Sequence, residues 1–211
     1  MQRAIAGAVA ALIIGAGSAA AQDACSRHVR EPDVGGWSSY QMFEKEKPKG
    51  TLRFAIVGRE ERGSSTLNRF EMTISDEKGK EQMTMQVLVP GWPYEGGAIE
   101  GMVMQPAGRE PMLVGGPMLG MMKSQATKSG GPAKDCDRMQ FVGNESVTVP
   151  GGTFQAARYR DAESGAEVWA TSDVPFGFVK TQDGKGNTML LTDHGADAKS
   201  AITGTPRPMG G

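Results

Sequence analysis

Residues 70–74, Phe-Glu-Met-Thr-Ile, and residues 83–89, Met-Thr-Met-Gln-Val-Leu-Val, place an apolar side chain at every second position. Successive side chains of a β-strand point to opposite faces, so this alternation predicts strands with one buried face. Residues 51–57, Thr-Leu-Arg-Phe-Ala-Ile-Val, continue the pattern. We therefore expect a meander of three antiparallel strands near the start of the fold.

The same alternation recurs elsewhere in the chain and predicts about ten strands in all. The further predicted strands cover residues 36–44, 99–105, 138–142, 147–149, 153–160, 166–171, 176–182 and 187–193. One segment breaks the pattern. After Pro117, the residues Met118, Met121, Met122 and Gln125 recur at helical spacing and predict one short helix, between Pro117 and Thr127. The predicted fold is mainly β: a curved antiparallel sheet or half-barrel with one short helix over its face or edge.

The first residues have the order of a secretory signal peptide. Arg3 precedes an apolar run over residues 4–14, and small residues follow up to Ala21. A membrane anchor is the alternative, but the run is shorter than the ~20 residues that span a bilayer. We predict a signal peptide at 1–21 cleaved near Ala21, a single β domain at 22–195, a flexible tail at 196–211, and a periplasmic or secreted location.

Composition excludes several classes of protein. The 211 residues carry 23 Lys and Arg against 24 Asp and Glu, a net charge of -1, which argues against a nucleic-acid binder. The 30 Gly and 12 Pro stay below the level of a disordered low-complexity chain, so a folded domain rich in turns is expected. No later segment offers 18 consecutive apolar residues, so no transmembrane segment is expected.

Two cysteines, Cys25 and Cys136, lie in the part of the chain that would be exported. An even number of cysteines in an oxidising compartment favours a disulfide. A free thiol or half of a metal site is the alternative, although no C-x-x-C motif or neighbouring histidine supports either. The predicted bridge would be structural.

Residues for catalysis are few. The two histidines, His28 and His194, are not accompanied by a nucleophile signature such as G-x-S-x-G. A Ser-His-Asp arrangement assembled in space remains an alternative, since triad members need not be neighbours in sequence. We expect no enzyme activity, no catalytic residues and no cofactor.

Methionine is the compositional exception, with 14 in the chain. Thioethers are soft ligands suited to Cu(I), so a copper-binding protein is one hypothesis, although no metal ligand can be assigned. The competing interpretation is that methionine fills an irregular core or lines an adaptable hydrophobic surface, and the alternation of Met83 and Met85 favours it.

The same side chains motivate the leading hypothesis, an apolar groove that holds a lipid or other hydrophobic small molecule. The candidate groove residues are Trp37, Phe54, Met72, Met83, Met85, Met118, Met121, Met122 and Trp169. A fully packed core without a cavity is the alternative, and the protein would then be a structural module that binds an unknown protein partner. A pocket lined by Met and Phe, of roughly 300 Å³ or more, would favour carriage of a ligand.

Two stretches carry a family resemblance. Residues 36–40 read Gly-Trp-Ser-Ser-Tyr and, with Gly35, have the form Gly-x-Trp-x-x-Tyr. Residues 147–154, Val-Thr-Val-Pro-Gly-Gly-Thr-Phe, are followed by Trp169 and by Val174-Pro175. These motifs resemble uncharacterised secreted bacterial β proteins whose fold is similar to that of the periplasmic lipoprotein carriers. The resemblance implies a curved sheet or half-barrel with a helical lid, and carriage of hydrophobic ligands in the cell envelope.

Overall fold

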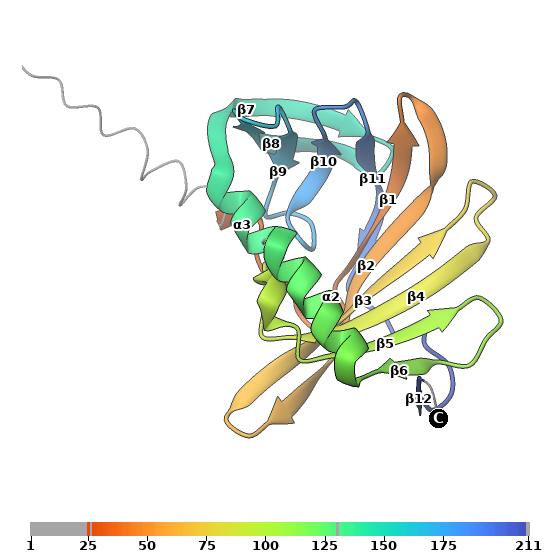
Figure 1. Cartoon of the computed structure of the whole chain (residues 1–211). Coiled ribbons are helices and arrows are strands. Elements are labelled where there is room, and N and C mark those ends of the chain that lie inside the picture. The colour runs from red at the N-terminus through yellow and green to blue at the C-terminus, as the bar shows by residue number, and fades with distance from the viewer. Residues whose placement is uncertain (1–24, 26, 130, 210–211) are drawn as a thin grey trace, which may run out of the picture.

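The computed structural model describes residues 25, 27–129 and 131–209, and the strands among them form one sheet (Figure 1). The strands are β1 (Trp37–Glu44), β2 (Lys47–Arg62), β3 (Ser65–Ser75), β4 (Glu81–Val89), β5 (Gly101–Pro106), β6 (Met112–Val114), β7 (Met139–Val149), β8 (Gly152–Asp161), β9 (Glu167–Ala170), β10 (Phe178–Gln182), β11 (Thr188–Gly195) and β12 (Arg207–Pro208). Their order is β12-β6-β5-β4-β3-β2-β1-β11-β10-β9-β8-β7, and only β12 and β6 pair in parallel. The predicted mainly β class with a curved antiparallel sheet is confirmed. The predicted signal peptide lies outside the described residues.

One pairing unites two meanders into this sheet. β1 lies between β2, its neighbour in sequence, and β11, which comes about 150 residues later. Tyr40 faces Leu52 on one side and Leu191 on the other, and all three are apolar residues on the same face. We call this the inner face, and the opposite one the outer face. Because β1 pairs on both sides, its inner face lies at the middle of the core.

The inner face is packed with aromatic rings. Phe54, Phe70, Trp92 and Phe176 contact one another with ring centroids 5.0–6.3 Å apart. They come from β2, from β3 and from two loops. Offset and edge-to-face aromatic pairs add stability beyond the area they bury. This cluster therefore holds the strands of one meander against the loops of both.

Two helices cross in front of the sheet where one was predicted (Figure 1). The predicted helix lies within α2 (Gly116–Ser129), and α3 (Gly131–Arg138) follows it. Residues 130–132, Gly-Gly-Pro, are typical of a helix end, but Pro132 lies in the first turn of α3, where proline needs no N–H partner. α2 packs on the short 3-10 helix η1 (Gly96–Ala98), where a side chain at Gly96 would collide with the Ala126 carbonyl. In the described part of the chain, no helix is long and apolar enough to cross a membrane.

The predicted disulfide is confirmed. Cys25 and Cys136 are bonded across a separation of 111 residues, and both are buried. The bridge ties the segment before β1 to α3. On the chain-entropy model, closing so long a loop stabilises the fold by up to ~4.7 kcal/mol.

The end of the chain differs from the predicted flexible tail, because residues 197–203 are bonded to side chains of the outer face. Asp197 accepts a hydrogen bond from the Trp37 indole at 2.9 Å, and the Thr203 amide donates to Gln105 at 2.9 Å. The short strand β12 then adds to β6. The sequence suggested a tail because these residues are polar and rich in Gly and Pro. Their partners are polar groups of the sheet, which hydrophobic patterning does not reveal.

Glu71 of β3 is the principal anchor of this segment. Its side chain is 1% exposed and accepts hydrogen bonds from the Ser200 hydroxyl at 2.7 Å and from the Ala201 amide at 2.9 Å. Gln86 donates a third at 3.1 Å. Bonds to a carboxylate are the stronger kind, so a buried Glu71 with three donors fixes the tail to the sheet.

We expect Glu71→Ala to release the tail. Loss of the carboxylate leaves its donors unpaired and should lower the free energy of unfolding by about 1–3 kcal/mol. Trypsin should then cleave after Lys199, next to Ser200, faster than in the wild type. The matched control is Glu77→Ala, an exposed glutamate in the turn after the same strand. Equal cleavage rates at Lys199 in all three proteins would contradict this anchoring role.

Candidate functional site

The register of β2 to β6 places apolar inner-face residues side by side in rows that cross the strands. One row is fully packed and consists, in order of pairing, of Ile56, Phe70, Val87, Met102 and Val114, none more than 7% exposed. Directly opposed residues lie close enough for their side chains to touch. This row is the true core of the first meander.

The next row is partly open to solvent and rich in methionine. In order of pairing it is Phe54, Met72, Met85, Met104 and Met112. Phe54 is buried, but the four methionines are only half-buried. We call these four methionines the methionine ladder. A third row, Leu52, Ile74, Met83 and Pro106, is half-buried as well. The inner face therefore passes from a packed core to an open apolar surface.

A pocket of about 310 Å³ adjoins the ladder at Phe54. The disulfide and the α3 residues Pro132 and Asp135 form one wall, and Met139 of β7 lies beside them. The sheet supplies Phe54, Val168, Phe178, Thr181 and Met189, and the loops supply Val29 and Trp92. A pocket of at least roughly 300 Å³ lined by Met and Phe was expected to favour carriage of a ligand, and this pocket has that size and lining. Residues of both meanders and of the disulfide meet here.

Two further hollows differ in character. One of about 390 Å³ shares Thr181 and Met189 with the pocket and extends to Met42 and Asn187 near the ends of two hairpins. A larger one of about 680 Å³ lies between β6 and β12, but it is bordered by charged residues, including Arg109 and the Glu110–Arg207 ion pair. The first continues from the pocket but is also lined by the charged residues Glu44, Lys49 and Asp183, whereas the second is a polar surface depression.

Neither of the two tryptophans predicted for the groove lines the pocket. Trp37 lies on the outer face, with Arg53 over its ring at 4.7 Å. Trp169 is covered by Lys180 at 4.2 Å and by Arg158 at 5.2 Å, and its indole donates to Glu145.

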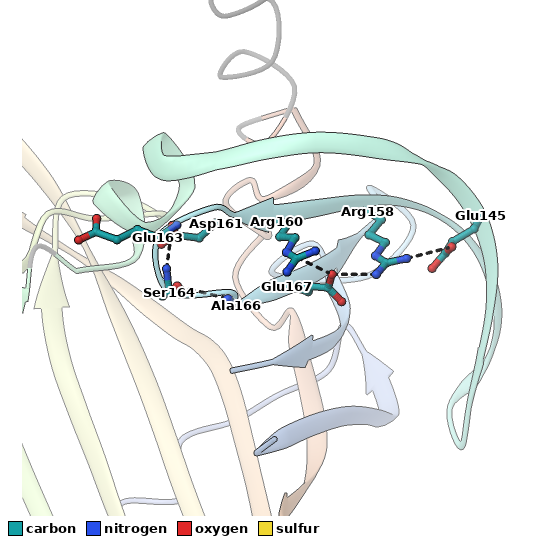
Figure 2. Close-up of polar contacts among 8 residues, drawn as sticks. All are labelled: Glu145, Arg158, Arg160, Asp161, Glu163, Ser164, Ala166 and Glu167. Atoms are coloured by element: carbon teal, nitrogen blue, oxygen red, sulfur yellow. Dashed lines mark hydrogen bonds and ion pairs between the residues drawn. The ribbon is translucent and has the colours of Figure 1, made fainter. Parts of the chain in front are cut away.

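Charged side chains on β7, β8 and β9 surround Trp169. Figure 2 shows Arg158 between Glu145 and Glu167, and its bond to Glu167 is 2.7 Å long. Arg160 adds a longer ion pair to the same glutamate. Trp169 therefore packs under an ion-pair network on the outer face.

The predicted methionines of the helix divide between two environments. Met118 and Met121 are 42% and 67% exposed and face solvent, whereas Met122 packs against the core together with Leu119 and Ala126. The inward stripe of α2 is thus shifted by one residue from the predicted one. Of the predicted groove residues, Phe54 lines the pocket, and Met72, Met83 and Met85 lie on the open part of the inner face.

Several pocket residues were missed. Val168, Phe178 and Met189 lie at positions of their strands whose side chains point to the inner face, so the alternation of apolar residues could have indicated them. Trp92 could not be found in this way because it stands in a loop, in Gly91-Trp92-Pro93. The role of the disulfide as a wall depends on the position of α3, which no pattern of the sequence predicts.

The electrostatics of the site are set by burial. Loss of hydration raises the pKa of Tyr40 well above its ordinary value, while a hydrogen bond with Ser38 acts in the opposite direction. The protonated hydroxyl donates to the Phe178 carbonyl at 3.1 Å and joins β1 to β10 beneath the pocket. At the rim, desolvation likewise raises the pKa of Asp135, although Arg138, bonded to it at 2.8 Å, lowers it.

Comparison with known proteins gives likeness in structure only. No family model matches the chain, and no curated protein matches it either. A candidate lipoprotein from Parabacteroides distasonis matches with a TM-score of 0.41 and 11% identity, over 80% of this chain and 98% of that one. A candidate exported protein with a YmcC-like fold from Bacteroides fragilis gives 0.43 and 12%, over 80% and 99%.

A DUF1329 family protein from Desulfovibrio piger matches more distantly, with a TM-score of 0.30 and 10% identity, over 82% of this chain and 87% of that one. At such scores and identities the likeness carries no information about a ligand.

Two matched substitutions on β5 distinguish core from open surface. Met102→Ala removes a side chain that is 7% exposed, and should lower the free energy of unfolding by about 2–5 kcal/mol. Met104→Ala removes one from the half-buried ladder two residues away, and should cost about 1 kcal/mol or less. Urea denaturation of both variants measures the difference. Equal losses would show that the ladder is ordinary core.

Proposed function

We propose that this protein is an exported, non-catalytic carrier that holds a hydrophobic ligand against the inner face of its sheet. The observation that supports this most directly is the apolar pocket of about 310 Å³, which adjoins the methionine ladder through Phe54. Ligand pockets are typically concave, mostly apolar and furnished with few polar groups. Here the pocket holds the part of the ligand that must be buried, and the ladder receives the rest.

Export is supported by the chain itself. The bond between Cys25 and Cys136 belongs to an oxidising compartment, and the first 21 residues have the three-part pattern of a secretory signal. A carrier in such a compartment would meet membrane lipids and their breakdown products. The location and the ligand class are therefore compatible.

The half-buried methionines suit a ligand of variable shape. Their unbranched side chains re-pack at little cost, and thioethers contact apolar groups well. An open apolar surface is unfavourable in water at roughly 25 cal/mol per Å². A ligand that covers the ladder removes this cost and buries its own apolar surface against the methionines.

The proposal is tested with N-phenyl-1-naphthylamine, a dye that fluoresces in apolar sites. Met85→Lys places a charge on the ladder and should weaken binding of the dye by about tenfold or more, because a charge is costly to bury. The matched control is Leu113→Lys, on the exposed side of β6, which should bind as the wild type does. A wild-type protein that binds no dye, or a Met85→Lys variant that binds it normally, would overturn the proposal. Failure of the wild type would favour the partner-binding module.

Binding of Cu(I) is a second candidate, supported by the ladder. Four thioethers on adjacent paired strands offer soft sulfur ligands without any His or Cys. Among the described residues, no cluster of three His, Cys, Asp or Glu side chains could hold a metal, so methionine would have to supply the site.

Titration with Cu(I) against a weak competing chelator separates the two candidates. A copper site on the ladder predicts stoichiometric binding that Met85→Leu abolishes, because leucine keeps the apolar surface but has no sulfur. For a hydrophobic carrier, Met85→Leu should leave dye binding within about twofold of the wild type, because the substitution is nearly isosteric. No binding of Cu(I) beyond that of the chelator eliminates the copper candidate.

A further inference from the structure

Methionine is distributed unevenly over the inner face. In the packed row, that of Phe70 and Val87, it occupies one of five positions, Met102. In the row beside it, the methionine ladder takes four of five. The packed row is buried, whereas the ladder is half-buried. Leucine would present a similar apolar surface to solvent, so what methionine adds at the ladder is its thioether sulfur.

The thioethers are the groups of this chain that peroxides oxidise most readily. The chain has two cysteines, and both belong to the disulfide, so no thiol competes for the oxidant. Susceptibility to oxidation follows exposure. Met121 is 67% exposed, whereas Met102 and Met139 are 7% and 8% exposed. The half-buried ladder lies between these extremes, so an oxidant in solution should reach it before the core.

Oxidation would change the character of the ladder. Methionine sulfoxide is polar, and its oxygen accepts hydrogen bonds. The rows on both sides of the ladder consist of apolar side chains, which carry no donor for that oxygen. A sulfoxide on the ladder would therefore depend on water for its hydrogen bonds. A hydrophobic ligand that covered it would remove this water, and burial of an acceptor without a donor is unfavourable.

We propose that the methionine ladder is a reversible oxidation site: a hydroperoxide converts its thioethers to sulfoxides, and the carrier then releases its hydrophobic ligand. This inference rests on the proposed carrier function and adds the way in which binding is controlled. The packed row is shielded and stays reduced, so the fold survives the oxidation. Reduction of the sulfoxides restores the apolar surface and with it the binding of the ligand.

The reaction is a two-electron oxygen transfer. The sulfur lone pair attacks one peroxide oxygen, the S–O bond forms as the O–O bond breaks, and the second oxygen leaves with both protons as water. Sulfur is thereby oxidised and the peroxide is reduced. In the reverse step a methionine sulfoxide reductase supplies two thiols, which become a disulfide while the sulfoxide oxygen leaves as water.

The site itself is tested without any ligand. The wild-type protein is treated with hydrogen peroxide, and the oxygen gained by each methionine is followed over time by peptide mass spectrometry. Met121 should be oxidised fastest, the ladder next, and Met102 and Met139 slowest. Oxidation of the ladder no faster than that of Met102 would overturn the inference and leave the carrier function standing.

The effect on the ligand is measured with N-phenyl-1-naphthylamine. Wild-type protein with an oxidised ladder should bind the dye about tenfold or more weakly than untreated protein, because polar oxygens then lie on the apolar face. The test variant carries the substitutions Met72→Leu, Met85→Leu, Met104→Leu and Met112→Leu. It keeps the apolar surface without the sulfur, so peroxide treatment should change its affinity for the dye by about twofold or less.

The matched control is Met118→Leu/Met121→Leu, which removes the two exposed thioethers of α2 and keeps the ladder. Peroxide should weaken its dye binding as much as that of the wild type. Unchanged binding by the oxidised wild type, or an equal loss in the ladder variant, would overturn the inference but not the carrier function. Untreated wild-type protein that binds no dye would overturn the carrier function itself.

Reduction of the oxidised protein serves if the ladder variant fails to fold. Oxidised wild-type protein is incubated with thioredoxin and two methionine sulfoxide reductases, one for each sulfoxide epimer. Dye binding should return, whereas incubation with thioredoxin alone should leave it weak. Circular dichroism should show the same sheet before oxidation, after it and after repair. Ladder thioethers that are restored without any return of dye binding would overturn the inference independently of any variant.

Discussion

The pairing of β1 with β11 is the constraint on which the site depends. It joins the meander of β1 to β6 to that of β7 to β11, so that Tyr40 faces Leu52 and Leu191 at once. Phe54 and Trp92 come from the first part of the chain, and Val168, Phe178 and Met189 from the second. Without this pairing each meander would expose its own apolar face. The disulfide then closes the pocket by holding α3 at its edge.

The same register explains why part of the inner face is packed and part is open. Each strand contributes one residue to each row, so directly opposed residues of a row pack side by side. The row that contains Phe70 and Val87 lies in the aromatic core, whereas the row of Met72, Met85 and Met104 is only half-buried. Apolar side chains in an incompletely covered row are a cost to stability. Their regular placement across neighbouring strands is what makes the surface suitable for a ligand.

Much of this fold could be predicted from alternation alone. Most of the strands, the inner face of β2 to β4 and the disulfide follow from local pattern and cysteine count, whereas β6 and β12 were not predicted and β7 was expected as two separate segments. The two misplaced tryptophans show where such reasoning needs more care: Trp169 alternates with Val168 and shares its face with Glu167, so the pattern already places it outside. The docked tail depends on the buried Glu71, and the pocket depends on Trp92 in a loop. Both arise from contacts between distant segments, which no local pattern encodes.

The two parts of the proposed site differ in stiffness, and this difference suits different parts of a ligand. Trp92 stands among closely packed rings and forms a stiff part of the pocket wall. The ladder consists of flexible thioethers, which adapt to many chains but discriminate little between them. A carrier built in this way would hold one part of its ligand in a fixed pocket and tolerate variation in the length of the rest. A stiff pocket wall and an adaptable surface would thus adjoin each other on one face of the sheet.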